Sequence, residues 1–535
     1  MPAPLERGCF KVCRQSGRVV GLTPRFRWLR WLPPVVGLAA LLWYLVRVLP
    51  KPSRAAYPCQ QVAAPAAFGF LAYLAGTLGF AVALRRTRSY WGQHRFLVAG
   101  AAALVAALLG LALVHKEASA LRAAATLAEH PRAPMGIARG LVLGRVAWAW
   151  DARVCRWNER NGCWWTKDNT DQAGVDAMAS RAVQSITKTD SDRAAWEALF
   201  RHFNQERRGR AAGYARGEKI AIKINLNNDR RSYDDTPWIN ASPHLINALL
   251  RQLTRAAGVP ESAIAVFDSS RYLTPHLYDY VHGAFPGVVL VDGYGGLPGR
   301  VKAEWTPNRI TYAVATKMGT AVASVAVEAD YLINLYIAKG HPSAGVTLSA
   351  KNHYGSVDGR DHTYISVKQQ GYDKYNPLVE LLGHRDLGGK TILNVCDMLY
   401  ACYHSDALPI RWNLPPFNGD WPASLLMSQD PVAIDSVATD FLVAEFAART
   451  DIPEGVNVKG KKIDMTNCDA PLHEAARADQ PPSGIVYAPN GDGVRLKSLG
   501  VHEHWNNPID KQYSRNLGSG AGIELVPIFL GRPAQ

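Results

Sequence analysis

Residues 219–270 alternate between strand and helix patterns in the segments KIAIKINLN (219–227), SPHLINALLRQLTRAAG (242–258) and AIAVFDSS (263–270). The first and third segments are short apolar runs with several β-branched residues, which is typical of buried strands. The middle segment spaces its apolar residues as an amphipathic helix does, and Ser242 followed by Pro243 is a typical helix start. A strand, a helix and a second strand in this order predict two parallel strands joined by a crossover helix.

The alternation continues in both directions along the chain. Five further segments predict strands: GLVLGRVAWAW (140–150), GVVLVDGY (287–294), ADYLINLYIAKG (329–340), TILNVCDML (391–399) and SLLMSQ (424–429). Helices are predicted at residues 172–186, 191–203, 276–285 and 430–448, the last with Asp430 as N-cap. The predicted fold class is therefore α/β, with a mostly parallel sheet that carries helices on both faces.

The positive charge of the chain is concentrated at its N-terminal end. The 535 residues include 60 Lys and Arg against 45 Asp and Glu, a formal net charge of +15. Residues 1–150 hold 19 of the basic residues and only three of the acidic ones, so the rest of the chain is nearly neutral. Because the sequence shows no basic patch interleaved with aromatic residues, a nucleic acid is not expected as a partner.

Three apolar runs in this N-terminal region approach the roughly 20 residues that a helix needs to cross a bilayer. They span residues 31–50, 62–84 and 96–114. We therefore expect a three-helix transmembrane region at 31–115 with the lipid bilayer as a partner, although a buried helical hairpin of a soluble protein is the alternative. The expected organisation is a basic leader (1–30), this region, a linker (116–140) and a soluble α/β domain (141–535).

The flanking cations predict an orientation in the membrane. Arginine and lysine are frequent in the leader and in the second short loop (85–95), and such residues are retained on the cytoplasmic side. An inside N-terminus followed by three crossings predicts a multi-pass protein of the bacterial cytoplasmic (inner) membrane, with its soluble domain in the periplasm.

The cysteines leave two interpretations open. Cys155 with Cys163, and Cys396 with Cys402, are close enough in sequence to form disulfides in an oxidising compartment. Buried free thiols are the alternative. The spacing of an iron–sulfur cluster is missing, so no such cofactor is expected.

Polar side chains stand where several predicted strands end. In an α/β sheet, ligands bind beyond the carboxyl ends of the strands, so side chains at these positions are candidates for a shared crevice. The candidates are Lys223, Asn225, Asn227, Asp268, Lys339, His341 and Asp397.

The segment AKGHPSAGVTLSAKNHYGS (338–356) adds Thr347, Lys351, Asn352 and His353 to Lys339 and His341. A helix over residues 345–352 would place Thr347 and Lys351 on one face. Ammonium groups, an imidazole and an amide at one crevice form an anion site, suited to phosphate or carboxylate. An internal ion-pair network with Asp397, Asp430 or Asp435 is the alternative.

Four segments together resemble the prokaryotic DUF362 family over about residues 215–445: IAIKINLN (220–227), INLYIAKGHPSAGVTLSAKNHYG (333–355), LNVCDML (393–399) and SQDPVAIDSVATDFL (428–442). The resemblance implies an α/β fold and a shared site but no defined reaction. The positions that match the family pattern are Lys223, Asn225, Lys339, His341, Lys351, Asn352, Asp397 and Asp435. Some relatives carry ferredoxin-like cysteine clusters, which this chain lacks, and residues 446–535 extend beyond the pattern.

His502 and His504, in SLGVHEHWNNP (498–508), could bind a divalent metal from one strand face. Ordinary surface or core histidines are the alternative, and His341, His353 or an aspartate are candidates for the missing ligand. The metal is the one cofactor that the sequence suggests.

Three functions follow from these features. The first is an enzyme-like domain of undefined activity that binds a small anion through Lys223, Lys339 and Lys351. In it His341 transfers a proton, and Asp397 or Asp435 orients the histidine or holds a cation. The second is a non-catalytic module that binds an envelope protein partner through the Trp-rich loop at 155–165. The third is a metal-dependent hydrolase or oxidoreductase.

Overall fold

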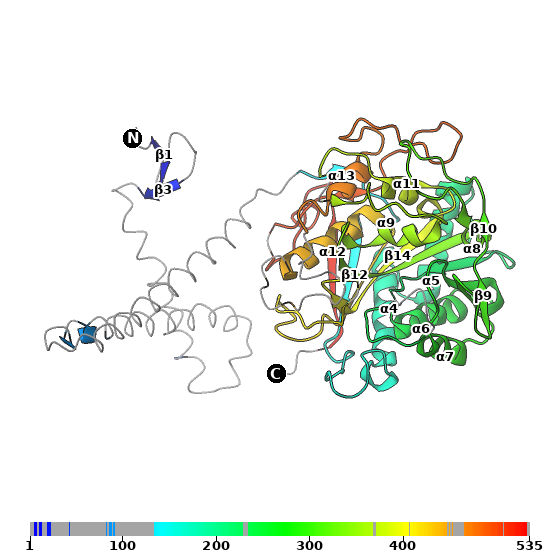
Figure 1. The fold of residues 1–535 in the computed structure, drawn as a ribbon, viewed down its shortest axis with the longest axis horizontal. Helices are drawn as coiled ribbons and strands as arrows, with labels where there is room; N and C mark the ends of the chain where they lie inside the picture. The colour runs from blue at the N-terminus through cyan, green and yellow to red at the C-terminus, as the bar shows by residue number, and fades with distance from the viewer. Residues whose placement is uncertain are drawn as a thin grey trace. The chain divides into compact units, whose positions relative to one another are not determined.

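The computed structural model describes residues 133–227, 234–367, 371–405, 407–446, 449, 452, 465–506 and 508–531, together with scattered positions before residue 91 (Figure 1). The chain divides into two compact units, residues 1–128 with residue 535, and residues 129–534. The described part of the first unit contains three short strands that pair antiparallel, β1 (Leu5–Arg7), β2 (Phe10–Val12) and β3 (Val19–Leu22).

The prediction of a three-helix transmembrane segment is corrected by the structure. Within the parts of the chain that the structure describes, no helix is long and apolar enough to cross a membrane. The predicted spans 31–50, 62–84 and 96–114 lie outside the described residues apart from single positions. Apolar composition fits a membrane crossing only where the chain forms one continuous helix of about 20 residues. The assignment to the bacterial inner membrane with a periplasmic domain rested on those spans and is withdrawn with them.

The second unit is built on a ten-stranded sheet. Its strands are, in spatial order, β17 (Glu524–Phe529), β5 (Arg145–Trp150), β15 (Ser424–Ser428), β14 (Thr391–Cys402), β12 (Tyr331–His341), β6 (Ile220–Lys223), β7 (Ile264–Asp268), β8 (Val289–Asp292) and β9 (Arg300–Lys302). The tenth, β13 (Gly345–Thr347), pairs with the end of β12.

The sheet is mixed, with most of its strand pairs parallel, as the sequence predicts. Neighbouring strands are parallel from β14 to β9, and β17 is parallel to β5. Strand β15, however, is antiparallel to both of its neighbours, β14 and β5. The described residues between β14 and β15 form no crossover helix, and a strand that follows without one returns in the opposite direction.

Two groups of helices accompany the sheet (Figure 1). The first group packs together as α4 (Gln172–Thr187), α5 (Asp192–Arg208), α6 (Pro243–Arg251) and α7 (Pro275–Ala284). The second comprises α9 (Ser349–Asn352), α11 (Pro377–Gly383), α12 (Pro431–Phe446) and α13 (Ala470–Ala476). Every residue of β6 and β15 is buried, as strands covered on both faces require.

Side chains at the helix starts explain where two of these helices begin. Asp430 Oδ1 accepts hydrogen bonds from the amides of Val432 and Ala433, at 3.0 and 2.9 Å, and so caps α12. Helix α6 begins with Pro243 after Ser242, but the Ser242 side chain makes no capping hydrogen bond.

Most of the cysteines and tryptophans that were candidates for disulfides or for a contact surface are buried, whereas Cys163 and Trp165 are half-buried. The four cysteines of the two possible pairs, Cys155, Cys163, Cys396 and Cys402, are all free thiols. Trp157 and Trp164 are buried, and Trp157 stacks on Trp421 with ring centroids 5.4 Å apart. These two rings therefore pack in the core and do not anchor an exposed contact surface.

Candidate functional site

A pocket of about 290 Å³ lies at the edge of the sheet where β6, β7 and β12 end. We call it the strand-end pocket. Nine of the residues singled out in the sequence line it: Lys223, Asn225, Asn227, Asp268, Lys339, His341, Thr347, Lys351 and Asn352. Parallel strands deliver their carboxyl ends to one edge, and this is the reason these distant residues meet.

The end of β12 folds back on itself to form one wall of the pocket. Lys339 lies directly opposite Thr347 in the antiparallel ladder between β12 and β13, so the two side chains share a face of the hairpin. Gly345 has φ of 72°, a conformation that glycine adopts without strain, and it starts the return strand. The predicted helix over residues 345–352 is therefore wrong in its first half, and only Ser349–Asn352 is helical.

Asp397 and Asp435 do not line the pocket. Asp435 accepts hydrogen bonds from the amide and the hydroxyl of Ser349, at 3.0 and 2.7 Å, and so fixes the start of α9. Asp397 accepts from the amide of Ser242 at 2.9 Å, at the start of α6. Burial raises the pKa of both carboxyl groups to about 6. Both residues support the elements around the pocket and neither contacts His341.

Lys223 forms a buried ion pair with Asp268. Its Nζ lies 3.3 Å from Asp268 Oδ2, and both side chains are at most 2% exposed. The same Nζ donates to the carbonyl of Ile224 and to Oδ1 of Asn352, at 2.5 and 3.3 Å. Burial lowers the pKa of Lys223, and Asp268 opposes that effect. The predicted network with Asp397, Asp430 or Asp435 is thus replaced by this pair at the pocket wall.

The remaining cations give the pocket its positive character. Five cationic side chains line it against the single carboxylate of Asp268: Lys223, Lys339, Lys351, Arg271 and Arg360. Lys339 Nζ donates to Asn227 Oδ1, and Lys351 Nζ lies 4.0 Å from the centre of the Tyr354 ring. Burial holds the pKa of Lys351 well below its usual value, and the nearby charges of Lys339 and Arg360 lower it further. No carboxylate among the described residues forms an ion pair with Lys351.

His341 presents one defined ring nitrogen to the pocket. Its Nδ1 accepts hydrogen bonds from the amides of Ser343 and Ala344, both at 3.1 Å, so the neutral ring carries its proton on Nε2. Burial and the charges of Lys351 and Lys339 hold the pKa of His341 well below its usual value. The ring is therefore neutral and offers an N–H donor, which suits anion binding better than the predicted proton transfer.

Three further polar groups complete the pocket wall. Thr347 Oγ1 and Asn225 Oδ1 are buried and have no hydrogen-bond partner within the described parts of the chain. Asn352 uses its amide to join α9 to the sheet, with Nδ2 2.8 Å from Asn334 Oδ1. The first two are thus available to a ligand, whereas Asn352 has a structural role.

Comparison with known families covers this same part of the chain. Residues 220–440 match the family described as "Domain of unknown function (DUF362)". We refer to this matched part of the chain as the DUF362 domain. The match runs from β6 into α12 and includes the strand-end pocket, whereas α13 lies beyond it. A comparison with curated proteins found no match.

Sequence reasoning missed several residues that line the pocket of the DUF362 domain: Arg271, Tyr354, Arg360 and His362. Arg271 follows the strand-end motif that contains Asp268, and a search of the residues just after each strand would have found it. Arg360 and His362 come from a loop without a periodic pattern, so no signal in the sequence pointed to them.

The DUF362 domain also borders a larger pocket of about 710 Å³ at the opposite edge of the sheet, where β12 and β14 begin. Asp330 and Thr391 mark that edge. None of the predicted site residues lines this pocket. We take the strand-end pocket as the candidate site because buried polar and charged groups from several segments converge there.

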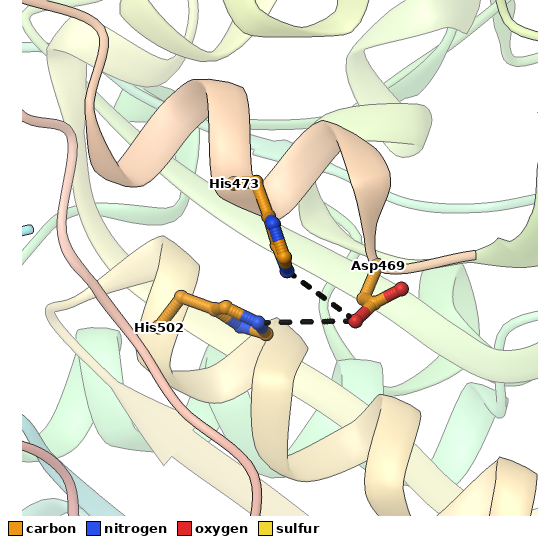
Figure 2. A group of neighbouring side chains, drawn as sticks. All are labelled: Asp469, His473 and His502. Carbon is orange, nitrogen blue, oxygen red and sulfur yellow. Dashed lines mark ion pairs between the residues drawn. The ribbon is translucent and has the colours of Figure 1, made fainter. Parts of the chain in front are cut away.

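A second group of polar side chains lies just beyond the DUF362 domain (Figure 2). His502, the last residue of β16 (Val501–His502), lies beside Asp469 and His473, and the potential ligand atoms of these three residues lie within 4.8 Å of one another. His504 Nε2 lies 2.9 Å from Asp469 Oδ2. The sequence pointed to His502 in β16 and to the nearby His504, but not to Asp469 and His473. The latter two residues are four positions apart at the start of α13. Of the two histidines considered as a third ligand, His341 lines the strand-end pocket instead, and His353 is buried in the turn that follows α9.

Proposed function

We propose that the strand-end pocket of the DUF362 domain binds a small ligand that carries a phosphate or carboxylate group. The observation that carries the proposal is the excess of four cationic side chains over carboxylates in the pocket lining. Burial lowers the pKa of Lys351, and repulsion by the nearby charges of Lys339 and Arg360 lowers it further. A bound anion would offset this repulsion. A volume of about 290 Å³ suits a small molecule.

The lining residues divide into two roles in this proposal. The ammonium group of Lys223 contacts Asp268, the carbonyl of Ile224 and the amide oxygen of Asn352, so this residue stabilises the wall of the pocket. Lys339 and Lys351 supply the charge that attracts the ligand. The guanidinium groups of Arg271 and Arg360 offer the forked donors that match phosphate and carboxylate oxygens.

Neutral donors would fix the orientation of the ligand. The Thr347 hydroxyl and the Nε2–H of His341 both belong to the hairpin of β12 and β13 that forms one wall. Such preorganised donors bind a negative charge without the cost of reorienting solvent. The proposal therefore assigns His341 a binding role, as a donor to the anion.

The test is thermal unfolding with inorganic phosphate and with succinate as probes. A phosphate concentration 100-fold above Kd adds about 2.7 kcal/mol to the free energy of unfolding and raises Tm. We expect Lys339→Ala and Lys351→Ala to weaken this stabilisation, with Kd about 10- to 100-fold higher, because each removes a charged hydrogen-bond donor. Lys219→Ala is the matched control, since the Lys219 side chain is 59% exposed and pairs with Glu328.

Two results would contradict the proposal. One is the absence of any anion-dependent rise in Tm for the wild-type protein. The other is an equal response of Lys219→Ala and Lys351→Ala. Lys351→Met keeps most of the volume of the side chain; if it also fails to fold, Lys351 is a structural residue.

A further inference from the structure

We propose that Asp469, His473 and His502 form a binding site for one divalent transition-metal ion of the zinc class. This site is separate from the strand-end pocket, and it does not depend on the function proposed there. It draws on two residues, Asp469 and His473, that no sequence pattern singled out.

The three imidazoles converge on one carboxylate oxygen. The distances from Asp469 Oδ2 to the Nε2 atoms are 3.5 Å for His473, 3.9 Å for His502 and 2.9 Å for His504. Ligand atoms on a tetrahedral zinc ion, with bonds of about 2.1 Å, lie about 3.4 Å apart. The separations for His473 and His502 are slightly longer than that value, and Figure 2 shows the side chains of Asp469, His473 and His502 directed toward one another.

Hydrogen bonds on the far side of His502 set its tautomer. Its Nδ1 lies 2.8 Å from Ser436 Oγ, and the hydroxyl of Ser436 donates to the carbonyl of Val432 at 2.7 Å. Because a hydroxyl has one proton, Ser436 must accept from His502, which places the imidazole proton on Nδ1. The lone pair on Nε2 then faces Asp469, as a metal ligand requires.

Asp469 also has outer partners. His504 hydrogen-bonds to it from outside the ligand group, with Nδ1 2.6 Å from Asp440 Oδ1 and Nε2 2.9 Å from Asp469 Oδ2. The hydroxyl of Tyr372 donates to Asp469 Oδ1 at 2.5 Å and leaves Oδ2 for the centre. Metal-bound histidines and carboxylates usually have such outer partners, which fix the ring and the tautomer.

The ligand types and their burial select the class of metal and its role. Two imidazoles and one carboxylate favour zinc and neighbouring transition metals over calcium or magnesium, which prefer oxygen ligands. The side chains of His502 and Asp469 are only 3% and 8% exposed, as in closed structural sites. The ion would fasten α13 and β16 to α12, because Ser436 and Asp440 belong to that helix.

The test uses the full-length protein, purified without a polyhistidine tag. The protein is loaded with zinc chloride, passed through a desalting column and analysed for metal by mass spectrometry. We expect one zinc ion per chain in the wild type and in His282→Gln, a control histidine on α7. We expect the metal to be lost from His473→Gln and His502→Gln. Ser436→Ala should keep the ligands but raise the Kd for zinc about 10- to 100-fold.

A wild-type protein without stoichiometric zinc after loading would overturn the proposal, and a proton on His504 Nε2 would then account for its short distance to Asp469. Where the histidine variants fail to fold, cobalt(II) added to the metal-free wild type decides. An intense tetrahedral absorption spectrum supports the site, and the weak spectrum of a hexahydrated ion contradicts it. Loss of phosphate binding leaves these results unchanged, so this proposal and the one for the strand-end pocket fail independently.

Discussion

Of the lysines in the strand-end pocket, Lys351 is the one whose positive charge is least favoured by its surroundings. Lys223 has Asp268 at 3.3 Å, and Lys339 has Asn227 as a hydrogen-bond acceptor. Burial lowers the pKa of both Lys223 and Lys351. Asp268 opposes this effect at Lys223, whereas neighbouring cations add to it at Lys351. Each pKa unit corresponds to about 1.4 kcal/mol. An anion that binds beside Lys351 favours its protonated form and raises its pKa, so anion binding is coupled to proton uptake.

This coupling predicts that anion binding weakens as the pH rises. The pKa of Lys351 is lowered in the free protein and rises toward its usual value in the complex, so the complex holds more protons between these two values. Sulfate is the suitable probe, because its charge is constant over this range. Titration calorimetry in buffers of different ionisation enthalpy should show proton uptake on binding.

Lys351→Arg provides the control for this prediction. Arginine stays protonated and keeps the positive charge, so we expect sulfate binding with a smaller pH dependence and less proton uptake. Identical proton uptake in the wild type and in Lys351→Arg would show that another group is responsible.

At the scale of elements, the hairpin of β12 and β13 and the short helix α9 hold the pocket together. Gly345 has a positive φ where the return strand begins, and Asp435 holds the first residues of α9 through Ser349. Neither residue touches a ligand in our proposal. Their substitution should change stability and pocket geometry without removing a charge from the lining.

Gly345→Ala should destabilise the protein by about 1 kcal/mol, because alanine is strained at positive φ. We also expect weaker phosphate binding, since the hairpin carries Lys339, His341 and Thr347. Gly283→Ala is the matched control: this helical glycine has open space around it, and alanine there should be neutral or stabilising. Urea denaturation measures both effects, and equal stability changes in the two variants would contradict the argument.

Asp435 should make the protein more stable at pH 5 than at pH 7. Burial raises its folded pKa to about 6, above the usual value of about 3.9 in an unfolded chain. The folded state therefore binds more protons between these values, and the free energy of unfolding falls as the pH rises through them. From pH 5 to pH 7 this contribution is about 1 kcal/mol.

The measurement compares the wild type with Asp435→Asn by urea denaturation at both pH values. The amide does not titrate, so the advantage of the wild type over the variant should shrink by about 1 kcal/mol from pH 5 to pH 7. A constant difference would mean that Asp435 has the same pKa in the folded and unfolded states.

At the scale of the whole molecule, the sequence specified short segments better than their arrangement. The predicted strand segments at 219–227, 263–270, 287–294 and 329–340 each contain a strand of the sheet, because apolar β-branched runs are a local signal. The direction of β15 is not a local property. It depends on how the chain returns after β14, which periodicity does not show.

The difference between local sequence signals and tertiary arrangement also explains which residues of the candidate site could be predicted. Lys223, Asp268 and Lys339 could be placed together from the sequence because each ends a strand of one sheet. Arg360 and His362 come from an irregular loop, and Asp469 and His473 come from a segment about 30 residues before His502. Only tertiary packing determines where such segments lie. The transmembrane prediction failed for a related reason. It inferred continuous helices from hydropathy alone, and the described residues contain no helix that is long and apolar enough to cross a membrane.

The ion pair between Lys223 and Asp268 also constrains how the sequence of this domain can evolve. Loss of either partner leaves an uncompensated charge in the dry interior, at a cost of about 3–5 kcal/mol, whereas joint replacement by apolar residues of similar size can be nearly neutral. A lineage that lost one of them in a single mutational step would pass through a poorly folded intermediate. We therefore expect the two positions to be inherited together, so that related sequences either retain both residues or have exchanged both.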